Sequence, residues 1–290
     1  MGKLKINNTL KWILKLGITV LCLWFISRKI KWGETWSLIQ LSDKWFLLIA
    51  LICFVASKIV SSFRLNIYFQ NIHVNLSQSS NLKLYWLGMF YNLFLPGGIG
   101  GDAYKVILLN RQKNGGIKSL SAAVLLDRIS GVIGLIGLAS LASCFINSTY
   151  NYFLLFFLGT VVCIVVYYFI MISTLKPVSQ FLCFIQTVFL GIVVQFLQVV
   201  SAYFILKSIG ITHYHSEYIL IFLLSSMAAI LPISIGGLGV REMVFLWGST
   251  EFFLDKQQSV SVSLLFYMIT VIVSFVGIRW VYKNPVPANA

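Results

Sequence analysis

Long runs of apolar residues, separated by short polar segments, dominate the pattern of this chain. A bilayer core of about 30 Å needs about 20 helical residues at 1.5 Å each. Six runs approach that length, at residues 9–27, 45–62, 119–146, 152–173, 181–206 and 259–282. The pattern predicts an all-α integral membrane protein with about six full transmembrane helices, in which residues 1–44 form an N-terminal anchor helix and loop.

Two further apolar segments, at residues 84–112 and 218–250, are interrupted at their centres. The first contains Pro96, Gly97, Gly98, Gly100 and Gly101, and the second contains Pro232, Gly236, Gly237 and Gly239. Because Pro lacks a backbone N–H and Gly weakens a helix, each segment is expected to break there. Neither arm of either segment can span a bilayer alone. Each segment is therefore predicted to be a re-entrant helical hairpin or a single broken span.

The distribution of Lys and Arg favours hairpins, because cytoplasmic loops are enriched in these residues. With a cytoplasmic N-terminus, hairpins place 13 cations inside and 7 outside, whereas broken spans give 9 and 11. Three full spans separate the hairpins, so the hairpins enter from opposite faces and their tips can meet near the midplane. We predict a single polytopic domain over residues 1–290, multi-pass in a bacterial cytoplasmic membrane, with both termini cytoplasmic.

The two breaks share a sequence pattern. The string L-P-x-x-I-G-G begins at Leu95 and again at Leu231, and the same offset aligns Lys105 with Arg241. Corresponding breaks in two halves are typical of transport sites, because helix ends and Gly-rich turns offer N–H groups to an anion. The alternative is that the glycines only allow a tight turn or close packing. We predict a pseudo-repeat whose halves are centred on residues 84–112 and 218–250.

Composition narrows the class of protein further. Only 10% of the residues are charged and 59% are hydrophobic, which excludes an ordinary soluble domain. The net charge of +14 would suggest nucleic acid in a soluble protein, but in so apolar a chain it indicates anionic lipid at a membrane surface. We therefore expect no nucleic-acid partner. The five cysteines lie in apolar runs and are expected to pack as small hydrophobic residues without disulfides.

Charged residues within predicted membrane segments are costly and are functional candidates by default. Three of the eight carboxylates, Asp102, Asp127 and Glu242, lie at the breaks or inside a span. Asp102 and Lys105 are three residues apart on one helix face and can pair, either within a binding site or as a structural ion pair. Arg241 and Glu242 follow the second break. They belong either to the binding site or to a surface ion pair on the outer side.

Asp127 is followed at helical spacing by a stripe of small residues, Gly131, Gly134 and Gly137. Such a stripe admits a close neighbouring helix, for which a hairpin is the candidate, and Lys105 or Arg241 would then compensate the acid. Arg128 points about 100° away from Asp127, so a lipid-phosphate contact or snorkelling is as reasonable as pairing with that acid. Lys58 is expected to snorkel toward the cytoplasmic surface.

The sequence gives little support for an enzyme. There is no P-loop and no Gly-x-Ser-x-Gly elbow in the sequence. The string His213-x-His215-x-Glu217 could bind a metal but is more typical of a plain loop. We expect no catalytic residues, no metal site and no cofactor.

Three motifs together resemble a known family. They are Asn92 to Lys105, then Asp127-Arg128-Ile129-Ser130-Gly131, then Leu231 to Glu242, which includes Ser234. The chain resembles the flippase-like transmembrane family, the membrane half of the bacterial lysylphosphatidylglycerol synthase or multiple peptide resistance factor, from about its second span to its last. In two-part relatives that half is thought to move lipid, and a cytosolic acyltransferase-like domain adds the amino acid. The sequence carries no counterpart of that domain, so aminoacyl transfer is not expected. Lys105 stands where the family commonly has Arg.

The combined interpretation is a flippase or transporter for an anionic phospholipid or a polyprenyl-linked lipid. Its predicted head-group site comprises Asn92, Asp102, Lys105, Asp127, Arg128, Ser234, Arg241 and Glu242. The cations would hold the phosphate and the carboxylates would compensate them when the site is empty. Envelope lipid or polysaccharide synthases and a second copy of the chain are candidate partners. Two alternatives stay open: a membrane enzyme that transfers a lipid head group, with Asp102 or Asp127 as base, and a scaffold that transports nothing.

Overall fold

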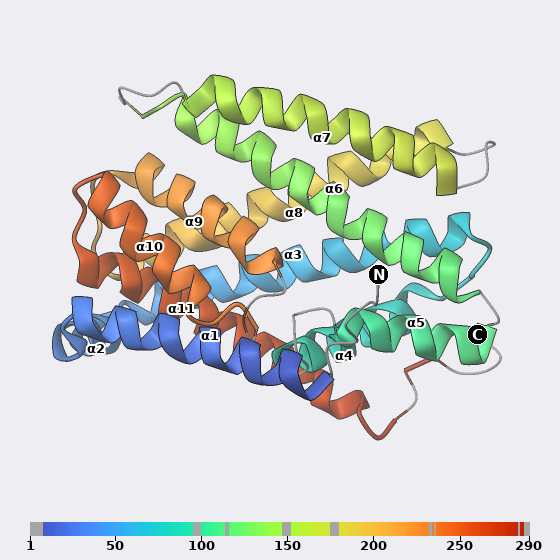
Figure 1. Ribbon diagram of the computed structural model, residues 1–290, viewed down its shortest axis with the longest axis horizontal. Coiled ribbons are helices and arrows are strands. Elements are labelled where there is room, and N and C mark those ends of the chain that lie inside the picture. Colours follow the sequence, from blue (N-terminus) through green and yellow to red (C-terminus); the bar gives the residue numbers. More distant parts are fainter. Residues whose placement is uncertain are drawn as a thin grey trace, which may run out of the picture.

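A computed structural model describes residues 8–94, 100–113, 116–146, 152–174, 180–231, 234, 236–283 and 285–286. Over these residues the secondary structure is helical (Figure 1). In chain order the elements are α1 (Asn8–Lys29), α2 (Trp32–Leu41), α3 (Lys44–Asn71), α4 (Gln78–Phe94), α5 (Gly100–Lys113), α6 (Ile117–Ser143), α7 (Tyr152–Thr174), α8 (Gln180–Ser208), α9 (His215–Ile230), α10 (Val240–Glu251), α11 (Lys256–Phe275) and the 3₁₀ helix η3 (Val276–Trp280).

Five helical stretches in the described part of the chain are long and apolar enough to cross a membrane. They are Lys44–Asn71, Ile117–Ser143, Tyr152–Ser173, Phe181–Ser208 and Lys256–Trp280. The chain is therefore an all-α membrane protein, as predicted. The sixth predicted span corresponds to α1, whose sequence includes Lys11, Lys15, Arg28 and Lys29 and which is not among the five. The exact number of crossings stays a prediction.

The helices α3 and α8 form an antiparallel pair at the centre of the bundle. The backbone N–H of Asp43 donates to Ser208 O at 2.8 Å at one end, and Ser201 Oγ donates to Ala50 O at 2.8 Å further along. In Figure 1, α3, α6, α7 and α8 all run roughly along the long axis of the molecule. We call the two ends of this bundle the α3 N-terminal end and the α3 C-terminal end.

The glycine stripe of α6 does admit close neighbours, but they are not the arms of the predicted hairpins. A Cβ on Gly134 would lie 2.8 Å from the carbonyl oxygen of Gly191 on α8. Beyond it, a Cβ on Gly137 would lie 3.8 Å from the methyl carbon of Thr160 on α7. The prediction that a hairpin fills this stripe is wrong, because two full-length apolar helices offer the longer surface to bury.

At the first break, α4 and α5 pack against each other in antiparallel fashion. The N–H of Gly101 donates to Asn92 Oδ1 at 2.8 Å, and the rings of Tyr91 and Tyr104 are 4.6 Å apart. A Cβ on Gly101 would overlap the backbone carbonyl of Gly88, so glycine is required at this contact. The arms have 17 and 14 residues, about 26 and 21 Å, which is shorter than a bilayer core. Pro96, Gly97 and Gly98 lie outside the described residues.

At the second break, α9 and α10 form a similar pair. Gly236, Gly237 and Gly239 have φ values of +61°, +82° and +85°, which glycine adopts without the strain other residues incur. A Cβ on Gly236 would lie 3.8 Å from Leu93 O, so the second connection reaches the end of α4. In Figure 1 the two helix pairs lie toward opposite ends of the long axis. Membrane entry from opposite faces and the pseudo-repeat stay predictions, and Pro232 lies outside the described residues.

Candidate functional site

A polar cavity of about 290 Å³ lies where the two helix pairs meet the middle of the bundle. Its charged lining residues are Lys58, Arg64, Asp102, Lys105, Asp127, Arg128 and Arg241. Five cations therefore face two carboxylates, a net formal charge of +3 among the described lining residues. Polar, uncharged groups come from Ser61, Tyr85, Asn92, Gln195 and Gln198. Six of the eight residues predicted for a head-group site line this cavity; Ser234 and Glu242 do not.

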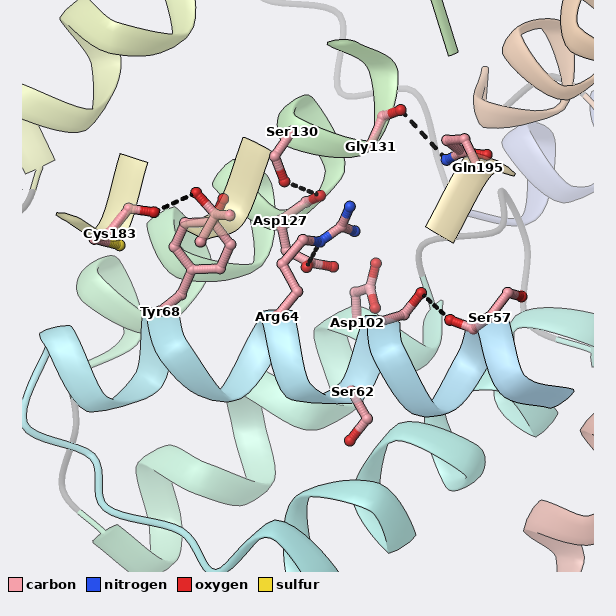
Figure 2. Close-up of polar contacts among 12 residues, drawn as sticks. Ser57, Ser62, Arg64, Tyr68, Asp102, Asp127, Ser130, Gly131, Cys183 and Gln195 are labelled. Atoms are coloured by element: carbon pink, nitrogen blue, oxygen red, sulfur yellow. Dashed lines mark hydrogen bonds and ion pairs between the residues drawn. The ribbon is translucent and has the colours of Figure 1, made fainter. Parts of the chain in front are cut away.

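The helix α3 carries a stripe of polar side chains, of which Ser61 and Arg64 line the cavity. Ser57, Ser61, Arg64 and Tyr68 follow one another at helical spacing on one face of an otherwise apolar helix. The serine hydroxyls donate to their own helix backbone, Ser57 to Phe54 O at 2.6 Å and Ser61 to Ser57 O at 2.9 Å. Figure 2 shows the resulting row, with Arg64 directed toward Asp127 and Ser62 on the opposite side of the helix.

Arg64 is the partner of Asp127. Its Nε donates to Asp127 Oδ1 at 2.7 Å, and both side chains are nearly buried (Figure 2). The prediction that Lys105 or Arg241 compensates this acid is therefore wrong. The physical reason is that α3 continues nine residues beyond its predicted end at residue 62, which places Arg64 inside the bundle. The Nη1 of Arg64 is buried without a hydrogen-bond partner, so the guanidinium keeps an unused donor.

Asp102 lies between two cations. Lys105 Nζ is 2.9 Å from its Oδ1, and Arg128 Nη2 is 2.6 Å from its Oδ2. The predicted pairing of Asp102 with Lys105 is present, whereas Arg128 reaches Asp102 on α5 rather than its sequence neighbour Asp127. The ammonium of Lys105 also lies 4.5 Å from the ring centroid of Tyr85, an attractive cation–π distance.

Two further cations rest against aromatic rings. Lys58 Nζ is 4.4 Å from the ring centroid of Phe54, and the guanidinium carbon of Arg241 is 5.1 Å from that of Phe266. Across the described ranges, no carboxylate lies within ion-pair distance of Lys58 or Arg241. The expectation that Lys58 snorkels to the surface is wrong, because its side chain lines the cavity. Ring faces stabilise a cation only partially, so both charges remain available to an anion.

Glu242 has a structural role. It is almost fully buried, its Oε2 accepts from Gly239 N at 2.7 Å, and its Oε1 accepts from Ser263 Oγ at 2.9 Å. It thereby caps the first turn of α10 and ties that helix to α11. Its burial contradicts the alternative of a surface pair, whereas the compensating role stays a prediction, because the carboxylate also interacts electrostatically with Arg241. Ser234 is buried in the second connection, away from the cavity lining.

Sequence reasoning missed Arg64 and the glutamines of α8. Gln195 and Gln198 line the cavity, and Gln195 Nε2 donates to Gly131 O at 3.3 Å. The usable signal was the spacing of polar residues by three or four within apolar runs, which puts them on one helix face. Several donors and few acceptors converge in the cavity, which favours a phosphate or carboxylate group over a neutral or cationic one.

Comparison with known proteins agrees with the membrane character of the chain. Residues 12–277 match the family model described as the lysylphosphatidylglycerol synthase TM region. The UPF0104 membrane protein PH1989 of Pyrococcus horikoshii is 28% identical over 151 residues, which is 51% of this chain. The matched part is 43% of that relative, so less than half of its length is covered. By the extent of the family match, the chain belongs to the family of lysylphosphatidylglycerol synthase TM regions.

Proposed function

We propose that the protein binds the anionic head group of a membrane lipid in its central cavity and moves that lipid between leaflets. The observation that carries the proposal is the net formal charge of +3 in a cavity that is lined by residues from the middle of the bundle helices. Uncompensated charge at that depth is costly. An anionic head group would offset it, and the acyl chains would stay in the bilayer.

The positions of the lining residues support a site near mid-membrane. Lys58 and Arg64 lie in the second half of the 28-residue α3, Asp127 before the centre of the 27-residue α6, and Gln195 near the middle of the 29-residue α8. A head group bound there would be about equally far from both surfaces. That is the position required of an intermediate in transfer between leaflets.

The two helix pairs add to the attraction for an anion. Asp102 lies in the first turn of α5, and Arg241 and Glu242 lie in the first turn of α10. Both helices thus begin beside the cavity, where the positive end of the helix dipole favours negative charge. Broken helices that point their N-termini at a midplane site are an architecture typical of transporters. We therefore interpret α4–α5 and α9–α10 as re-entrant hairpins.

The charges at the two ends of the bundle support an orientation. The five carboxylates outside the cavity motifs, Glu34, Asp43, Glu217, Glu251 and Asp255, belong to segments at the α3 N-terminal end. The α3 C-terminal end carries Lys83, Arg111, Lys118 and Arg279 and, over the described residues, no Asp or Glu. The α3 N-terminal end also carries cations, namely Arg28, Lys29, Lys31, Lys44, Lys207 and Lys256. Because the positive-inside rule counts Lys and Arg and gives Asp and Glu little weight, the cytoplasmic assignment of the α3 C-terminal end is proposed from the count over the whole sequence, 13 cations inside and 7 outside. We propose a role in binding rather than catalysis for Asp102 and Asp127, because both carboxylates already form ion pairs with cationic side chains.

The proposal is tested by reconstitution into liposomes. Fluorescent phosphatidylglycerol and phosphatidylcholine are compared by quenching from the outside, which reports exchange between leaflets. We expect faster exchange of phosphatidylglycerol, and we expect Lys105→Ala and Arg241→Ala each to slow it about tenfold, the effect of losing one hydrogen bond to a charged group.

The matched control is Lys118→Ala, which removes an exposed cation outside the cavity. Exchange at the wild-type rate in both Lys105→Ala and Arg241→Ala would show that the cavity is not the site. A covalent change of the lipid, detected by mass spectrometry, would favour an enzyme instead.

A further inference from the structure

A second, apolar pocket adjoins the polar cavity. It has a volume of about 480 Å³ and lies between α5 and α6. We call it the α5–α6 groove; its apolar lining comprises Ala103, Val106, Ile107, Ile117, Val124 and Leu125, with Ser121 on the α6 side. Asp102 and Arg128 line both the groove and the cavity. Their ion pair therefore lies at the boundary between the apolar α5–α6 groove and the cationic cavity.

The groove is open toward the surroundings of the bundle. Ile107, Leu125 and Ile117 are 50%, 53% and 60% exposed, and all three are apolar. In a membrane protein such side chains face lipid. A molecule that fills the groove and the cavity together must therefore carry a hydrocarbon part and an anionic part joined at one point, which is the chemistry of a lipid.

The length of the groove fits one acyl chain. From Arg128 back to Ile117 is eleven residues along α6, about 16 Å at 1.5 Å per residue. The hydrocarbon core is about 30 Å thick, so one leaflet contributes about 15 Å. A phospholipid acyl chain matches this length, whereas a polyprenyl chain would extend far beyond it.

We propose that the α5–α6 groove binds one acyl chain of a phospholipid whose anionic head group occupies the central cavity. This inference rests on the proposed function and names its substrate class, a glycerophospholipid. At the junction the phosphate contacts Arg128, whose side chain is 26% exposed and bound to acceptors such as Asp102 Oδ2 that an incoming phosphate can replace. The Asp102–Arg128 pair is thus the point of entry for the head group.

The direction of the groove assigns the lipid to a leaflet. The bound chain runs from the mid-depth cavity toward Ile117, at the α3 C-terminal end of the bundle. In a bilayer the acyl chains of each leaflet point away from its own surface. A lipid held in this way has the polarity of the leaflet at the α3 N-terminal end, with its head group drawn inward.

The test uses a photoreactive lipid in liposomes containing the full chain. Phosphatidylglycerol with a diazirine on one acyl chain is activated by light, and cross-linked peptides are identified by mass spectrometry. We expect cross-links in the groove to exceed those on α7, a largely lipid-facing helix, by about tenfold, or ~1.4 kcal/mol of preference. Phosphatidylcholine with the same chain should show no such excess.

Ser121→Trp fills the groove from an exposed position on α6 and should reduce cross-linking in the groove to the level of α7. Ile107→Trp fills the groove from the opposite wall, on α5, and should have the same effect. Leu141→Trp is the control, on the same helix outside the groove. Equal labelling of groove and α7, an excess that survives both groove variants, equal labelling by phosphatidylcholine, or a stronger excess with a polyprenyl phosphate probe would overturn the proposal. Because labelling does not require exchange, an absence of lipid transfer with intact groove labelling would remove the proposed function alone.

Discussion

Neutralising Asp127 should strongly destabilise the protein. In Asp127→Asn the guanidinium of Arg64 keeps its charge in a buried position but loses the carboxylate that it faces, Asp127 Oδ1 at 2.7 Å. With charge centres about 4 Å apart and an effective dielectric constant of about 20, the lost attraction is about 4 kcal/mol. Removing one partner of a buried pair typically lowers the free energy of unfolding by about 3–5 kcal/mol.

The measurement is unfolding in mixed micelles with increasing SDS, followed by circular dichroism. The matched control is Glu34→Gln, which breaks an exposed pair with Lys31 at 2.9 Å. That exposed pair should contribute almost nothing to stability, because solvent screens it. The double variant Arg64→Met/Asp127→Leu removes both charges and should recover most of the loss, because an apolar replacement of a buried pair is often neutral.

If the free energies of unfolding of Asp127→Asn and Glu34→Gln differ by less than about 1 kcal/mol, the buried charge of Arg64 does not require a carboxylate partner. The electrostatic explanation of the cavity then fails. If the double variant is as unstable as the single one, the loss comes from packing instead. A coupling free energy of about 3 kcal/mol between the two positions would support the electrostatic explanation.

Two further substitutions test the packing of the helix pairs in the same unfolding assay. Gly101→Ala should lower the free energy of unfolding by about 1–3 kcal/mol, since its Cβ would overlap a facing backbone carbonyl, whereas Gly33→Ala, with nothing within 4 Å, should be neutral or stabilising. An unchanged stability in Gly101→Ala would mean that α4 and α5 do not pack tightly against each other. Glu242→Ala should lower the free energy of unfolding by about 1–2 kcal/mol through loss of the α10 cap, and Glu251→Ala, at an exposed helix end, should have little effect. Equal losses in those two would rule out a special role for the cap.

Much of the architecture could be predicted from local pattern. The full-length apolar helices follow from run length, and the two breaks follow from Pro and Gly, because both effects act within a few residues. The Asp102–Lys105 pair was predictable for the same reason, since residues three apart share a helix face.

The partner of Asp127 was not predictable in this way. Arg64 is 63 residues away, and its contact depends on how α3 packs against α6 and α8. Hydropathy ended the predicted span at residue 62 because a charged residue follows, but the helix continues through Arg64 to Asn71. The backbone of a membrane helix gains from continuing past a charge whenever that charge has a partner inside the bundle. Glu242 was misassigned for a related reason, because the hydrogen bond that ties it to α11 comes from Ser263 of a different helix.

The polar stripe of α3 makes the length of that helix as significant as its composition. Each residue turns an α-helix by about 100°, so a single insertion or deletion between Lys44 and Ser57 would rotate Ser61 and Arg64 away from the cavity. Substitutions on the lipid-facing side of the same helix would leave the stripe in place. Related sequences can therefore exchange apolar residues along α3 freely, whereas insertions and deletions within this helix should be selected against.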